Sequence, residues 1–104
     1  MTALKLWAFI YKSPGSDPQA HHAEFLSQKH RTLIFGVDNL DEACQLARRL
    51  VGEGCIFLEL CGGFGEEGAR RVIEAIDCDV PVGYVGHSPQ EAEKLKRQLE
   101  KFAP

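Results

Sequence analysis

The stretch that decides the fold reads Cys55-Ile-Phe-Leu-Glu-Leu-Cys-Gly-Gly-Phe-Gly65. Its first seven residues are almost continuously apolar, which is typical of a strand in a parallel sheet that is covered on both faces. A helix is predicted after Gly65, because apolar residues recur there every three or four positions. These residues are Ala69, Val72, Ile73 and Ile76. The stretch therefore predicts a strand, a tight glycine turn and a helix.

Three further apolar runs predict the other strands, at about 4–11, 31–37 and 80–86. A helical pattern follows each strand, so strands and helices alternate along the whole chain. Such alternation with short connections predicts an α/β domain with right-handed crossovers. We expect a four-stranded, mainly parallel sheet with helices on both faces, in the flavodoxin-like order 2-1-3-4. This single domain would span residues 1–104.

The predicted helices differ in how clearly they are marked. Asn39-Leu-Asp-Glu42 and Ser88-Pro-Gln-Glu91 are capping boxes, in which a side chain caps the helix and an acid three residues later reaches back. The last helix carries an apolar stripe of Ala92, Leu95, Leu99 and Phe102. The first helix, over His21–Lys29, is the weakest, because only Ala23 and Leu26 suggest a buried stripe. If it does not form, an antiparallel α+β arrangement is the alternative.

Composition and charge limit the classes of function. The chain has 104 residues and a mass of 11.6 kDa, and its content of 44% hydrophobic and 26% charged residues is that of an ordinary globular domain. Its formal net charge of −3 disfavours nucleic acid or an anionic membrane surface as a partner. No apolar run reaches the ~20 residues of a membrane span, and the opening residues are interpreted as a strand rather than a signal peptide. A cytoplasmic location is therefore expected.

Two loops and one histidine are expected to meet at the carboxyl edge of the sheet. Open parallel sheets bind ligands there, beside the point where the strand order reverses. The loops are Lys12–Asp17, after the first strand, and Cys61–Gly65, after the third, and His87 leaves the fourth strand beside them. The residues predicted to bind a ligand are Lys12, Ser13, Gly62, Gly63, Phe64 and Gly65.

Gly63, Gly65 and Gly68 have the G-x-G-x-x-G spacing of a dinucleotide-binding turn, but their surroundings argue against one. An acidic residue that would hold the ribose is expected ~20 residues further on, and that region is apolar. Glu66 and Glu67 also occupy the first turn of the helix, where they would repel a phosphate. A tight turn with close backbone packing is the favoured interpretation, and no cofactor is predicted.

Glu59 is the unusual residue of the decisive strand. Strand geometry sends it to the same face as Phe57 and Cys61. An unpaired buried carboxylate is costly, so Glu59 either serves in proton transfer or ties the following loop by hydrogen bonds. Both interpretations stay open.

The four cysteines, at positions 44, 55, 61 and 78, show neither a C-x-x-C motif nor the spacing of a zinc site. We therefore predict no metal site. Cys61 is the candidate nucleophile, because it ends a strand just before a helix N-terminus, which stabilises a thiolate. Glu59 or His87 would then act as the base. The alternative is an inert Cys61 that packs beneath the loop, so whether the chain is an enzyme stays open.

The run Glu59-Leu-Cys-Gly-Gly-Phe-Gly65 resembles a small bacterial family that is a domain of unknown function. The likeness extends to Asp41-Glu-Ala-Cys44, to Gly68, to Val80-Pro-Val-Gly83 and to the Ala-Phe-Ile of the first strand. The resemblance implies a shared fold and marks the glycine loop, but it implies no reaction.

Three functions follow as hypotheses. The first is binding of an unknown small, non-nucleotide molecule at Glu59–Gly65, the second is a thiol-dependent enzyme that uses Cys61, and the third is a structural or interaction subunit. Thr32–Gly36 is predicted to be an apolar edge strand, which invites pairing unless it is covered. A homo-oligomer, most simply a two-fold dimer, is therefore expected.

Overall fold

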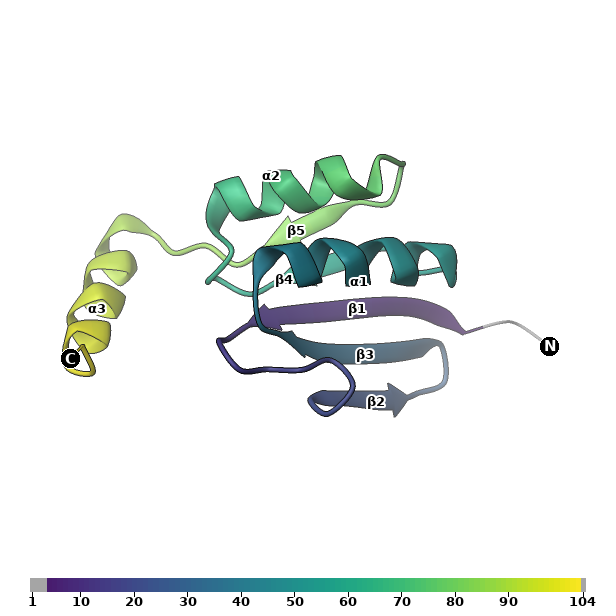
Figure 1. The fold of residues 1–104 in the computed structure, drawn as a ribbon, viewed down its shortest axis with the longest axis horizontal. Helices are drawn as coiled ribbons and strands as arrows, with labels where there is room; N and C mark the ends of the chain where they lie inside the picture. Colours follow the sequence, from purple (N-terminus) through teal and green to yellow (C-terminus); the bar gives the residue numbers. More distant parts are fainter. Residues whose placement is uncertain (1–3, 104) are drawn as a thin grey trace.

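Figure 1 shows the fold of the computed structural model, which describes residues 4–103. Over these residues a five-stranded sheet is combined with three helices. The strands are β1 (Lys5–Lys12), β2 (His22–Leu26), β3 (His30–Val37), β4 (Leu58–Leu60) and β5 (Val82–Tyr84). The helices are α1 (Leu40–Gly52), α2 (Gly65–Ile76) and α3 (Pro89–Glu100).

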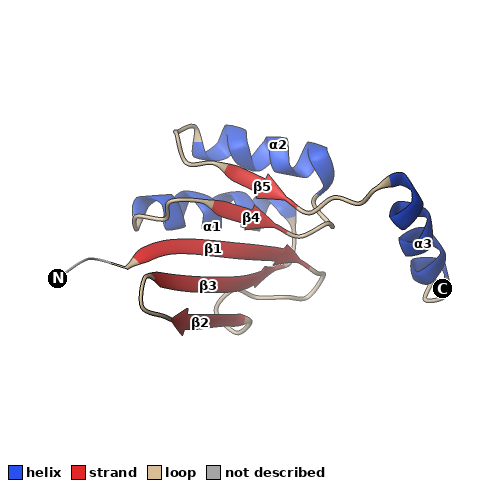
Figure 2. Ribbon diagram, turned by 180° about the vertical axis from the view of Figure 1, so that it is seen from behind, coloured by secondary structure: helices blue, strands red, loops and turns tan. Residues whose placement is uncertain are grey.

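β1 lies in the middle of the sheet, whose strand order is β2-β3-β1-β4-β5 (Figure 2). It pairs in parallel with β3 on one side and with β4 on the other, and β4 pairs in parallel with β5. β2 pairs antiparallel with β3. The four predicted strands, β3, β1, β4 and β5, are parallel and stand in the predicted relative order 2-1-3-4. The prediction of a four-stranded, mainly parallel sheet in flavodoxin-like order is nevertheless wrong for the sheet as a whole, because β2 adds a fifth, antiparallel strand and makes the sheet mixed.

The extra strand, β2, stands where the sequence predicts a helix over His21–Lys29. Ala23 and Phe25 lie opposite residues of β3 on one face of the sheet, so the segment follows the two-residue period of a strand. The spacing of Ala23 and Leu26 also fits one helical stripe, which is why the pattern alone misleads. Pairing with β3 satisfies the backbone N–H and C=O groups of this segment with hydrogen bonds, and this pairing makes the segment a strand.

β3 is consequently an inner strand, paired with β1 and with β2. The predicted open edge at Thr32–Gly36 does not exist, since its hydrogen-bonding groups face neighbours on both sides. The edges of the sheet are β2 and β5. Because β3 is not an edge strand, it gives no reason to expect a homo-oligomer.

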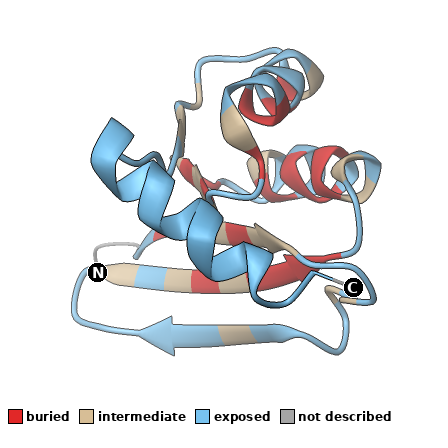
Figure 3. Cartoon of the chain, turned by 90° about the vertical axis from the view of Figure 1, so that its left-hand side faces the viewer, coloured by how far each residue is buried: buried red, intermediate tan, exposed pale blue. Residues whose placement is uncertain are grey.

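α1 and α2 lie side by side on one face of the sheet, so the prediction of helices on both faces is wrong (Figure 3). The reason is the direction of the crossovers. Both β3-α1-β4 and β4-α2-β5 move toward the same edge, and right-handed crossovers in one direction place their helices on one face. A helix on the opposite face would come from the β1–β3 connection, which moves the other way and contains β2 instead.

The hydrophobic core lies between α1, α2 and the face of the sheet that they cover. Every second residue of the three central strands is buried in it: Leu6, Ala8, Ile10, Leu33, Phe35, Val37, Leu58 and Leu60. At the start of α1, the Asn39 side chain accepts a hydrogen bond from the Glu42 N–H (2.9 Å), so the predicted cap is confirmed. Ser88 makes no such bond at the start of α3.

α3 stands away from the rest of the fold, and none of its residues is buried (Figures 1 and 3). The apolar stripe predicted for this helix faces no core: Leu95 is 41% accessible and Leu99 61%, and Phe102 just beyond the helix is 84% accessible. The molecule is 51 Å long but only 28 and 27 Å across. Within residues 4–103, no helix is both long and apolar enough to cross a membrane.

Candidate functional site

The ends of β1, β4 and β5 meet at the carboxyl edge of the sheet. The Cys61 N–H donates to the Ile10 carbonyl (3.0 Å), and the Lys12 N–H donates to the Cys61 Sγ (3.4 Å). The His87 ring lies over Gly62, because a Cβ placed on that glycine would stand 3.7 Å from the His87 Cε1. The structure thus brings Lys12, Cys61, Gly62 and His87 into one neighbourhood.

Ser13 and Phe64, two other residues of the predicted site, make contacts with other parts of the fold. The Ser13 N–H donates to the Val37 carbonyl (2.9 Å), which ties the loop after β1 to the end of β3. Phe64 is buried in the core, and the Lys12 ammonium stands 5.6 Å from the centre of its ring.

The glycine loop is packed as a tight turn into α2. Gly65 has a φ of +65°, a conformation that residues with a Cβ rarely adopt. Gly68 is buried, and a Cβ placed there would stand 3.2 Å from the Phe64 Cβ and 3.9 Å from the Leu40 Cδ1. Glu66 and Glu67 occupy the first turn of α2 and are exposed. These contacts agree with close backbone packing, and the two carboxylates disfavour an anionic ligand at this helix start.

The face of the sheet opposite α1 and α2 is aromatic, and none of the helices within residues 4–103 covers it. Trp7, Phe9 and Tyr11 alternate with the buried residues of β1, so they point to this open face. The Trp7 ring stacks on Phe57 with 5.0 Å between ring centres, and its Nε1 donates to Thr32 Oγ1 (2.7 Å). Each of these side chains is half-buried. The aromatic residues also alternate with the core residues in the sequence of β1. Because both kinds of residue are apolar, the segment is nevertheless recognised only as one continuous apolar run.

Two glycines make room for side chains on the open face. A Cβ on Gly36 would overlap the ring of Tyr11, so Tyr11 lies across β3 at this point. A Cβ on Gly83 would stand 2.7 Å from the Glu59 Oε2, so the Glu59 carboxylate lies over β5. Because these glycines have no Cβ, the side chains of Tyr11 and Glu59 can lie flat against the neighbouring strand.

Glu59 is a carboxylate on the same open face of the sheet. It is half-buried, and the burial pattern of β4 places it on the open face with Phe57 and Cys61, as strand geometry predicts. Phe9 is its partner in the β1–β4 register. Within residues 4–103, the Glu59 carboxylate takes part in no hydrogen bond or ion pair of the protein. An acceptor with free capacity therefore lies on the face that also carries the aromatic rings.

The cysteines fall into two groups. Cys44 and Cys55 are buried, and burial raises the pKa of both thiols. Each donates its S–H to a backbone carbonyl, Cys44 to Arg71 (3.8 Å) and Cys55 to Phe57 (3.1 Å). Cys61 is half-exposed and Cys78 is exposed. No group of three or more His, Cys, Asp or Glu residues within residues 4–103 is placed to hold a metal ion.

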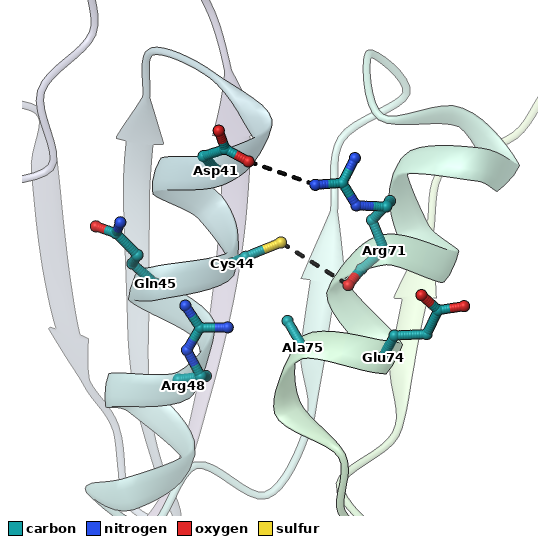
Figure 4. Close-up of a pocket in the computed structure, with 7 residues that line it drawn as sticks. All are labelled: Asp41, Cys44, Gln45, Arg48, Arg71, Glu74 and Ala75. Carbon is teal, nitrogen blue, oxygen red and sulfur yellow. Dashed lines mark hydrogen bonds and ion pairs between the residues drawn. The ribbon is translucent and has the colours of Figure 1, made fainter.

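A cavity that the sequence did not point to opens between α1 and α2 (Figure 4). It measures about 400 Å³, and the Arg71 guanidinium pairs with Asp41 across it (3.4 Å). Arg48 and Glu74 add one charge of each sign to the lining. The charges are balanced, so this cavity favours neither an anion nor a cation.

Residues 5–100 match a protein family described as a family of unknown function (DUF6506). The chain belongs to this family. The match covers the whole sheet and all three helices of the DUF6506 chain, which confirms the resemblance to a family of unknown function. Comparisons with curated proteins and with solved structures found no match. Membership in DUF6506 brings a shared domain and no assigned activity, so the function has to be inferred from the residues of the site.

Proposed function

We propose that this chain binds a small organic cation on the open face of its sheet, with Glu59 as the anionic contact. The observation that carries the proposal is the position of Glu59. Its carboxylate lies over Gly83, and the half-buried residue has no hydrogen-bond or ion-pair partner within residues 4–103. A carboxylate in such a place is costly unless a positive or hydrogen-bond-donating group completes it.

The aromatic rings on the same open face favour a cation for a second reason. Trp, Tyr and Phe rings carry negative charge on their faces and attract ammonium groups, most strongly where water is partly excluded. The open face presents Trp7, Phe9, Tyr11 and Phe57. Cys61 and His87 lie at the carboxyl end of this surface, where they would bound a ligand held at Glu59. A flat or quaternary ammonium compound matches this chemistry best.

Replacing Glu59 with glutamine is expected to weaken binding of benzyltrimethylammonium about tenfold or more, because it removes the attraction between opposite charges, which is about 1 kcal/mol in water and about 4 kcal/mol near a protein surface at about 4 Å. Titration calorimetry and thermal shift measure this, since a ligand at 100 times its Kd stabilises by about 2.7 kcal/mol. Glu66→Gln is the matched control, because Glu66 is exposed at the start of α2. Benzoate serves as the anionic probe.

The expected pattern is binding of the cation by the native chain and by Glu66→Gln, with loss in Glu59→Gln. Stronger binding of benzoate than of benzyltrimethylammonium would contradict the proposal. So would an unchanged affinity for the cation in a folded Glu59→Gln variant.

A second candidate function is thiol chemistry at Cys61, favoured by the surroundings of its sulfur. The Lys12 N–H donates to the Cys61 Sγ, and such a donor stabilises a thiolate. His87 lies over the adjacent Gly62 and could move a proton there.

Iodoacetamide at neutral pH is expected to modify native Cys61 and Cys78 and to spare Cys44 and Cys55, which are buried and have raised pKa values. Peptide mass analysis over time gives the four rates, and Cys61→Ser identifies the signal. Thiol chemistry requires Cys61 to react faster than the exposed Cys78. A slower Cys61 would assign this sulfur a packing role and leave cation binding as the function.

A further inference from the structure

Within residues 4–103, two apolar surfaces lack a covering partner. One is the stripe of α3 and its end, formed by Ala92, Leu95, Leu99 and Phe102. The other is the open face of the sheet, formed by Trp7, Phe9, Tyr11, Phe25, Ile34 and Phe57. A sheet face is normally covered by helices or by another sheet, and an amphipathic helix normally buries its apolar stripe.

The surface area of the molecule shows how much remains to be covered. A compact monomer of this mass, 11.6 kDa, exposes about 5,800 Å². This chain exposes 7105 Å². The surplus of about 1,300 Å² exceeds the roughly 800 Å² that each partner buries in a stable protein interface.

The shape of the molecule agrees with this surplus of exposed surface. Its radius of gyration is 14.8 Å, whereas a folded domain of 100 residues has a radius of about 13 Å. The long axis of 51 Å comes from α3, which projects beyond the carboxyl edge of the sheet (Figure 1). Four residues, Val85–Ser88, separate this helix from β5.

We infer that two copies of this chain form a two-fold dimer by exchanging α3, each helix covering the open sheet face of the other copy. A two-fold axis makes the contact reciprocal, so both unpartnered surfaces of both chains are buried at once. Aromatic residues such as Trp7, Phe9 and Tyr11 are the side chains enriched at interface centres.

Charge favours the same arrangement. The segment 89–103 carries four basic residues and three acidic ones, a net charge of +1. The chain as a whole has a net charge of −3, so the remainder carries −4. A weakly positive helix therefore approaches a negative body, and Glu59 lies on the face that it approaches.

The first measurement is the mass of the full chain by light scattering at micromolar concentration. The inference requires twice the chain mass of 11.6 kDa. A monomer mass at this concentration would overturn it, including the case in which α3 folds back onto its own sheet.

Leu99→Glu places a charge in the middle of the stripe and should raise the dimer dissociation constant about 30-fold or more. Gln90→Glu adds the same charge on the opposite side of α3 and should leave the dimer intact. Phe25→Glu tests the sheet surface, since Phe25 is 60% accessible on an edge strand and can change without loss of the core. Circular dichroism checks that each variant is folded.

Mixing the two disrupted chains separates exchange from any other dimer. Leu99→Glu keeps an intact sheet face and Phe25→Glu keeps an intact helix, so a mixed pair contains one undamaged contact. The mixture should form dimers at a concentration where each variant alone is a monomer. A wild-type dimer that Leu99→Glu leaves unchanged, or a mixture that stays monomeric, would overturn the exchange. These masses are measured without a cation, so dimer formation is decided separately from the proposed cation binding, although both use the open face.

Discussion

Replacing Leu58 with alanine is expected to lower the free energy of unfolding by about 3 kcal/mol or more. Leu58 is completely buried at the start of β4, between β1 and β5, on the face that α1 and α2 cover. Removing its side chain loses both the transfer free energy and the contacts around the resulting cavity, which together cost about 2–5 kcal/mol for leucine. A small domain has only about 5–15 kcal/mol in total. Urea denaturation at constant m-value gives the change directly.

Ile56→Ala is the matched control for this prediction, because it removes the same number of carbon atoms two residues away. Ile56 is 45% accessible, so its truncation should cost about 1 kcal/mol or less. Equal losses in the two variants would mean that β4 does not form the centre of the core described here.

Replacing Gly68 with leucine is expected to lower the free energy of unfolding by about 2 kcal/mol, although leucine is the better helix former. Gly68 is buried where α2 passes Phe64 and Leu40, and even a Cβ would stand 3.2 Å from the Phe64 Cβ. A larger side chain must push α1 and α2 apart or displace Phe64, and overpacking of this kind costs about 1–3 kcal/mol.

The control is Gly52→Ala, at the last residue of α1. No heavy atom lies within 4 Å of a Cβ placed there, so this change should be neutral or should stabilise by about 0.5–1 kcal/mol through helix propensity. Thermal and urea unfolding of both variants show whether each substitution lowers or raises the free energy of unfolding. Stabilisation by Gly68→Leu would show that the contact between the helices is not close at this position.

The sequence predicts the elements of this fold better than their layers. Local signals identify the helices of the core, because Asn39 caps α1 and the apolar residues of α2 share one stripe. The strand at 22–26 could not be recognised locally, since Ala23 and Leu26 fit a helical stripe and only pairing with β3 decides the structure. From its sequence, the same segment is expected to form the helix that covers the second face of the sheet. Because it forms β2 instead, that face is left open.

The candidate site was predictable in part for a related reason. Alternation along a strand places Glu59, Phe57 and Cys61 on one face without knowledge of the neighbours. The position of the Glu59 carboxylate over Gly83 depends on the register between β4 and β5, which no local pattern contains. The sequence therefore identifies the residue, and the register identifies what surrounds it.

The stack of Trp7 on Phe57 has a practical consequence, because Trp7 is the only tryptophan of the chain. Indole fluorescence shifts to shorter wavelength and changes intensity when water leaves its surroundings. Since this indole is half-buried on the open face, all tryptophan emission of the protein originates at the surface that a cation or a second chain would cover. The protein thus carries an intrinsic optical probe at the place where its binding events are proposed, and no label has to be introduced.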